Sequence, residues 1–167
     1  MGMNVSPQDS GSRWRRWDPH IHAPDTIMAN QFRGPDPWES YLSALEVQTP
    51  QIEALGITDY YCLECYERVR QEKAAGRLAG CALIFANVEL RLNYATVKGN
   101  WANLHLLISP EDPEHVTEAR RFLSHLTYEA HNDTFRCTRA ELMRLGGLSG
   151  AAQTPLRRSN LARASLR

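Results

Sequence analysis

Apolar and polar residues follow one another along this chain in short runs that predict β-strands separated by helices. Four runs have strand character, and residues typical of turns (Gly, Pro, Asn or Asp) stand near their ends. The third run contains Ala82-Leu83-Ile84-Phe85, which is apolar on both faces, so we expect this strand to lie inside the sheet. The predicted strands cover residues 14–23, 55–59, 82–92 and 101–109.

Helical patterns occupy the segments between and after these runs. Asp36 precedes Pro37, so a helix capped by the Asp36 side chain is expected to begin there. Thr138 and Glu141 form a capping box for a last short helix, and residues 93–100 are typical of a turn or hairpin connection. Alternating strands and helices favour the α/β class, with a mostly parallel sheet and crossover helices. The other predicted helices cover residues 62–75 and a segment from Pro110 to Leu126.

The 167 residues suit one domain with a sizeable core. We expect a polar leader at residues 1–12, a folded domain at 13–146, and an Arg/Ala/Ser-rich tail at 147–167. The leader and the tail lack a periodic apolar pattern, which predicts disorder in both. No acidic residue follows Glu141, while five arginines do, so the preceding part of the chain is net acidic.

Composition narrows the classes of partner. The formal net charge is +0, so charge gives no case for nucleic-acid binding by the whole chain. No apolar run approaches the roughly 18 residues that cross a bilayer, and no secretory pattern is present, so we expect a cytoplasmic protein without a membrane partner. The four cysteines are expected to be reduced thiols. We interpret the C-x-x-C at Cys62 and Cys65 as a chance spacing at the start of a helix and not as a zinc or redox motif, because no second such pair accompanies it.

The candidate chemistry begins at Asp18-Pro19-His20-Ile21-His22. Residues two apart on a strand project to the same face, so both imidazoles can point at one metal ion. Three later runs each carry one more potential ligand, and all fall late in their strands, where the active sites of parallel α/β proteins gather. Clustered divalent metals suit phosphate-ester hydrolysis, because they activate water and offset phosphoryl charge. The predicted metal ligands are His20, His22, Asp59, Glu89 and His105.

Each of these residues also has a plainer interpretation. The two histidines of the first strand could be satisfied polar residues, and Asp59 could be a turn or N-cap residue. Glu89 could pair with Arg91, which points to the same face at i+2. His105 could be a core histidine bonded to the backbone. The remaining histidines are expected to be solvated on helix faces or loops, namely His115, His125 and His131.

Together these motifs resemble those of the polymerase and histidinol phosphatase (PHP) family. Residues 18–22 are similar to its first motif, D-x-H-x-H, and residues 56–59 to its second. Glu89 resembles the glutamate of the third motif, and His105 the histidine that follows it. A closer similarity is to the PHP-like N-terminal domain of TrlF-type AAA-like ATPases. Further points of likeness to that domain are Arg13-Trp14, Tyr60-Tyr61, Tyr66 and Leu90-Arg91-Leu92.

The resemblance implies a partial, distorted (β/α)7 barrel, a TIM-like fold with up to three zinc, manganese or iron ions. His20 and His22 would hold one ion, and Glu89 would bridge it to a second, which His105 also binds. Asp59 would serve the third. Arg91 is the candidate substrate-binding residue. The implied reaction is hydrolysis of a phosphomonoester or phosphodiester by metal-bound hydroxide, on a substrate that is a nucleotide or a nucleic acid.

The chain also departs from the family. Tyr60 stands where most members have histidine, and the late ligands of the family have no counterpart after Gly146, so the chain resembles a truncated PHP domain. It contains no phosphate-binding G-x-x-x-x-G-K-[ST] loop, so an ATPase region would be supplied elsewhere. Two alternatives stay open: a non-catalytic metal-binding or interaction remnant, and an amidohydrolase, which also opens with H-x-H. The spacing from His22 to Asp59 favours the PHP interpretation.

Overall fold

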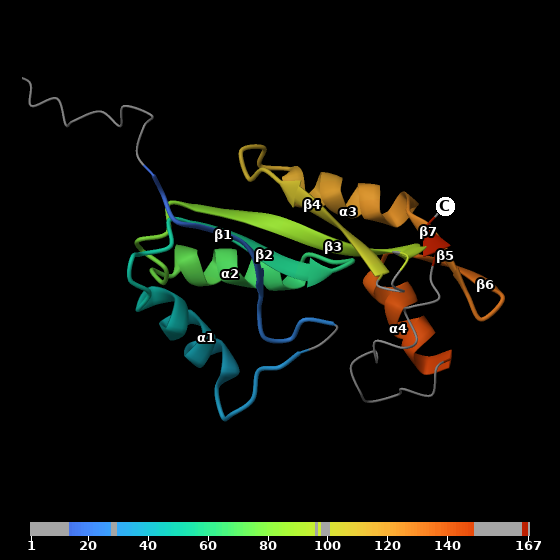
Figure 1. The fold of residues 1–167 in the computed structure, drawn as a ribbon, viewed down its shortest axis with the longest axis horizontal. Coiled ribbons are helices and arrows are strands. Elements are labelled where there is room, and N and C mark those ends of the chain that lie inside the picture. The colour runs from blue at the N-terminus through green and yellow to red at the C-terminus, as the bar shows by residue number, and fades with distance from the viewer. Residues whose placement is uncertain (1–13, 28–29, 96, 98–100, 149–164, 167) are drawn as a thin grey trace, which may run out of the picture.

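The structure, a computed structural model, describes residues 14–27, 30–95, 97, 101–148 and 165–166. This part of the chain is a mixed α/β fold built on a four-stranded sheet with the order β1-β2-β3-β4 (Figure 1). The first three strands are parallel and β4 is antiparallel to β3, so the predicted α/β class is confirmed. The sheet has two edges, β1 and β4, and a barrel is not seen in the described residues. The strands are β1 (Trp17–His22), β2 (Ala54–Tyr60), β3 (Leu83–Ala95) and β4 (Trp101–Ile108).

Two helices connect the parallel strands, and both lie below the sheet in Figure 1. The first, α1 (Pro37–Glu46), begins as predicted, with the Asp36 carboxylate accepting a hydrogen bond from the Glu39 N–H at 2.9 Å. The second, α2 (Glu64–Ala74), packs against β2. A third helix, α3 (His115–His125), follows β4 and contacts α2 through the pairs His115–Tyr66 and Arg120–Glu67.

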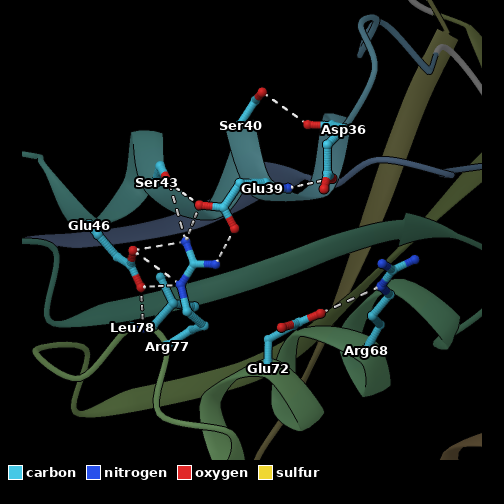
Figure 2. A network of polar contacts seen from close by, with 9 residues as sticks. All are labelled: Asp36, Glu39, Ser40, Ser43, Glu46, Arg68, Glu72, Arg77 and Leu78. Atoms are coloured by element: carbon cyan, nitrogen blue, oxygen red, sulfur yellow. Dashed lines mark hydrogen bonds and ion pairs between the residues drawn. The ribbon is translucent and has the colours of Figure 1, made fainter.

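Arg77 ties α1 to the segment that follows α2, as Figure 2 shows. Its guanidinium donates to the carboxylates of Glu39 and Glu46 and to the Ser43 hydroxyl. The backbone N–H of Leu78 donates to Glu46 at 2.7 Å. Several charge-assisted bonds from one planar guanidinium thus join α1 to the segment that leads from α2 to β3.

The core lies on both sides of β2, all seven residues of which are buried. Gly56 stands in the middle of this strand, and a Cβ built there would lie 2.2 Å from the carbonyl oxygen of Pro19 in β1. Only glycine therefore allows β1 to approach β2 this closely. This contact sets the position of the strand that carries His20 and His22.

A second sheet has the order β6-β5-β7, with β5 (Thr127–Ala130), β6 (Asp133–Arg136) and β7 (Ser165–Leu166). The β5–β6 hairpin, which the sequence did not predict, turns at His131 and Asn132, with φ of 52° and 59°. Two positive φ values are typical of a type I′ turn, which matches the twist of the strands it joins.

The helix α4 (Arg139–Leu148) begins as predicted, with the Glu141 N–H donating to the Thr138 hydroxyl at 3.4 Å. It extends two residues past the boundary expected at Gly146. The predicted leader, residues 1–12, and most of the predicted tail, residues 149–164 and 167, lie outside the described residues. None of the helices in the described part of the chain has the length and apolar character that a bilayer crossing needs.

Candidate metal centre

Three of the predicted ligands meet near the C-terminal ends of β1 and β2, where Glu89 in the middle of β3 pairs with Tyr60. His20 and His22 project from the end of β1, and Glu89 projects from β3. The two histidine Nε2 atoms lie 3.2 Å apart, and each lies 3.4 Å from Oε2 of Glu89. The three side chains therefore offer two nitrogens and one carboxylate oxygen to a single point.

These separations fit a bound divalent ion. With metal–ligand distances of about 2.0–2.2 Å, neighbouring ligand atoms of a tetrahedral site stand roughly 3.3–3.6 Å apart. In addition, Glu89 Oε2 is buried, and the polar groups that face it are the two imidazoles, whose Nε2 atoms lie 3.4 Å away. A buried carboxylate charge is costly unless it is paired, and a cation among the three side chains would offset it. Imidazole nitrogens with one carboxylate are a donor set that suits zinc and related transition metals.

Two asparagines support the ligands, and sequence reasoning assigned them no role. The Asn103 side-chain N–H donates to Glu89 Oε1. The Asn87 Oδ1 lies 3.0 Å from His105 Nδ1, and its Nδ2 donates to the carbonyl of Pro19 at 2.8 Å. Each asparagine stands two residues before a predicted ligand, so it shares that ligand's face of the strand, and this spacing is the signal that could have identified it.

His105 lies beside the three ligands rather than among them. It pairs across the strands with Glu89, and its ring centroid is 4.6 Å from that of His20. Its Nδ1 faces the Asn87 carbonyl oxygen, so the neutral ring carries its proton there and Nε2 keeps a lone pair. That tautomer is the one in which Nε2 can ligate a metal ion.

The electrostatics of the centre favour the charge states that a cation requires. Burial lowers the pKa of His105, partly opposed by the Glu89 charge, so the imidazole stays neutral. Burial alone would raise the pKa of Glu89, but the contact with His22 and the nearness of His105 and His20 hold it below its ordinary value. Metal ligands must be deprotonated, so a neutral imidazole and an ionised carboxylate are both ready to bind.

Tyr60 and Arg91 line the same face of the sheet. The Tyr60 ring stacks on His22, with centroids 5.2 Å apart and an interplanar angle of 19°. The Arg91 guanidinium lies 5.9 Å from the Tyr60 ring centroid. The alternative pairing of Arg91 with Glu89 is not observed between these two described residues. Arg91 is thus available near the ligands, and its role in binding substrate stays a prediction.

Asp59 lies apart from the other predicted ligands. Since Tyr60 faces His22, strand alternation turns its neighbour Asp59 to the opposite face of β2. There the Asp59 Oδ1 accepts hydrogen bonds from the Thr26 hydroxyl at 2.8 Å and from the N–H groups of Ile27 and Tyr60 at 3.3 and 2.9 Å. These bonds position the loop that follows β1.

His115, expected to be solvated, is buried, so that expectation is wrong. Its Nε2 lies 2.8 Å from the Tyr66 hydroxyl and 3.3 Å from an Arg70 nitrogen, while its Nδ1 faces the Asp112 carbonyl. His115 opens α3 and faces α2, so it joins these helices through polar contacts. His125 and His131 are exposed, as predicted.

An open cavity of about 800 Å³ lies between β4 and α3 and reaches His105. Its lining includes apolar side chains such as Leu106 and Leu123, together with the charged Arg121. The cavity therefore offers space for a molecule larger than an ion beside His105, while His20, His22 and Glu89 are not part of its lining.

The structure thus brings His20, His22 and Glu89 together, places His105 beside them and separates Asp59 from them. The sequence matches no protein-family model, and neither a curated protein nor a solved structure matches it. A functional assignment therefore rests on the geometry and chemistry of the ligand cluster.

Proposed function

We propose that this protein is a metal-dependent phosphoesterase of the PHP type, which hydrolyses a phosphomonoester or phosphodiester. The observation that carries the proposal is the convergence of two imidazole nitrogens, from His20 and His22, and a buried carboxylate oxygen of Glu89. The resemblance of the motifs to the PHP family adds the reaction class. It also supports a partial (β/α)7 barrel and an ATPase region supplied elsewhere, and a cytoplasmic location is part of the proposal because the sequence has no secretory pattern.

Each side chain of the cluster would have a distinct role in metal binding. His20 and His22 would hold a zinc, manganese or iron ion through Nε2, while Glu89 would offset its charge. His105, with its proton on Nδ1, is oriented to add a nitrogen to a second ion beside the first. A bound divalent ion would lower the pKa of a water molecule and offset the charge that develops on the phosphoryl oxygens.

Arg91 is the residue expected to contact the phosphate. Its guanidinium lies against the Tyr60 ring on the face that carries the ligands, and a planar guanidinium suits phosphate oxygens. The rest of the substrate would extend into the cavity between β4 and α3, which begins at His105. A nucleotide or nucleic-acid phosphate is the substrate class that the resemblance favours.

The test combines metal content with turnover. Elemental analysis after desalting should find transition metal in the unmodified protein and little in the His20→Ala/His22→Ala variant, because two nitrogen ligands are gone. The His125→Ala variant, which removes an exposed histidine far along α3, is the control and should keep its metal. Equal metal content in all three proteins would refute the centre.

Hydrolysis of bis(p-nitrophenyl) phosphate and p-nitrophenyl phosphate then tests catalysis. We expect turnover that depends on added zinc or manganese and disappears in the double histidine variant. A protein that binds metal through these histidines but turns over neither ester would instead be a non-catalytic metal-binding module, and the phosphoesterase proposal would fail.

A further inference from the structure

A second group of potential metal ligands lies where β2 ends and α2 begins. One ligand atom from each of Asp59, Cys62 and Glu64 lies within 4.8 Å of the others. Asp59 and Cys62 are buried, and Glu64 is partly buried. The group shares no residue with the histidine cluster, because Asp59 points to the opposite face of β2. It also uses a cysteine of the C-x-x-C motif, to which the proposed phosphoesterase function gives no role.

The Asp59 carboxylate is held as a ligand would be. It is 2 % exposed, and Oδ1 accepts three hydrogen bonds, from one hydroxyl and two backbone N–H groups. Its other oxygen, Oδ2, is buried and accepts no hydrogen bond from an N–H or O–H group of the described residues, while the thiols of Cys62 and Cys65 lie close to the carboxylate. A carboxylate with one oxygen anchored and the other without an N–H or O–H donor is oriented in advance for a cation, as metal-binding carboxylates are by their hydrogen bonds.

The donor set identifies the class of metal. Cys62 contributes a sulfur, which hard cations such as magnesium and calcium avoid and zinc accepts. The carboxylates of Asp59 and Glu64 provide negative charge to offset a divalent ion. Glu64 also lies 3.9 Å from the Arg120 guanidinium, which offsets part of its charge.

We propose that Asp59, Cys62 and Glu64 form a second metal site, which takes zinc or another divalent ion that binds sulfur. The ion joins the end of β2 to the start of α2. Because Asp59 also anchors Thr26 and Ile27, the site stiffens the loop that follows the histidine-bearing strand. The second Cys of the motif, Cys65, donates instead to the Pro24 carbonyl at 3.4 Å and stands outside the group.

Cobalt absorption spectroscopy separates this site from the histidine centre. The His20→Ala/His22→Ala variant is titrated with Co²⁺, since only a sulfur ligand gives sulfur-to-cobalt charge-transfer absorption in the near ultraviolet. We expect this absorption in that variant and its loss when Cys62→Ser is added. The control, Cys81→Ser, changes a buried thiol that donates to the Leu83 carbonyl, and it should keep the absorption. Added zinc should displace the cobalt.

Two results would overturn the second site. One is a folded double histidine variant that shows no charge-transfer absorption with cobalt. The other is absorption that persists after Cys62→Ser. If Cys62→Ser fails to fold, X-ray absorption fine structure of the zinc-loaded double histidine variant decides the question: a Zn–S shell at about 2.3 Å supports the site, and nitrogen and oxygen shells alone refute it. Because the histidine centre is absent from this protein, the outcome is independent of the phosphoesterase proposal.

Discussion

Replacing Gly56 by alanine would test whether the close approach of β1 to β2 positions the metal ligands. The new Cβ would lie 2.2 Å from the carbonyl oxygen of Pro19, 2.6 Å from its carbonyl carbon and 2.8 Å from Cε2 of Phe85. Two of these atoms belong to the backbone, so no side-chain rotation relieves the contact. Favourable approaches of carbon to a carbonyl oxygen begin at about 3.3 Å, so Pro19 must retreat by roughly 1 Å.

The same shift separates the ligands, because His20 follows Pro19 directly. Metal–ligand distances tolerate changes of about 0.2 Å, far less than the displacement, so the metal affinity should fall at least ~10–100-fold. Overpacking of this kind costs about 1–3 kcal/mol, which is small beside a typical folding stability of about 5–15 kcal/mol. Gly56→Ala should therefore fold, melt at a lower temperature and bind metal poorly.

Zinc titration calorimetry and thermal unfolding of the metal-free protein measure the two effects. The control is Gly147→Ala in α4, where a Cβ meets nothing within 4 Å. A helical Gly→Ala change there should stabilise the protein by up to about 0.5–1 kcal/mol and leave metal binding unchanged. If Gly56→Ala binds zinc as the unmodified protein does, the contact with Pro19 does not position the histidines and the reasoning is refuted.

Three other substitutions test separate parts of the structure. Asn103→Leu removes the hydrogen bond to the carboxylate of the centre, so the zinc affinity should fall ~10–100-fold in a chelator competition, whereas an unchanged affinity would contradict its supporting role. Phe135→Ala empties a fully buried position of the second sheet and should lower the free energy of unfolding in urea by about 3–5 kcal/mol without changing metal content. Arg77→Gln removes the hydrogen bonds that, with a backbone N–H, lower the pKa of Glu46 below its ordinary value of 4.5. A lowered pKa stabilises the folded state above pH 4.5, and this stability is lost as the pH falls through the folded-state pKa. The melting temperature of the unmodified protein should therefore drop more steeply below pH 4.5 than that of the variant. Parallel curves of melting temperature against pH would count against the Arg77–Glu46 pair.

The main sheet was predictable because its strands are marked by long or doubly apolar runs. The segment around Ile57 and the run Leu83–Phe85 are apolar on both faces, so they are expected in the interior of a sheet. The structure places β2 and β3 there. The β5–β6 hairpin was missed for the opposite reason. Its strands have four residues each, and its turn uses His131 and Asn132 rather than glycine. Neither the spacing of apolar residues nor the amino-acid composition of so short a hairpin distinguishes it from a polar loop.

Only the part of the candidate centre that depends on the alternation of side chains along a strand could be predicted from the sequence. The H-x-H spacing places His20 and His22 on one face whatever their neighbours are, and the structure agrees. The meeting of this pair with Glu89 depends on the order of β1, β2 and β3, which a single sequence does not specify. Asp59 was grouped with them because it ends a neighbouring strand, yet adjacent residues face opposite ways. Since Tyr60 faces the histidines, Asp59 is turned away.

The histidines stand on an edge strand, and this position couples metal binding to local unfolding. Among the described strands β1 pairs with β2 and with no other, and three of its six residues are exposed, so it is the strand of the parallel set that separates with least loss of buried contact. Glu89 belongs to the interior strand β3 and stays in place when β1 opens. An ion shared between the two strands would raise the free energy of that opening by about 2.7 kcal/mol at a free concentration 100 times its dissociation constant. Release of the ion and fraying of the N-terminal strand would then be one equilibrium, in which scarcity of metal exposes the edge of the sheet.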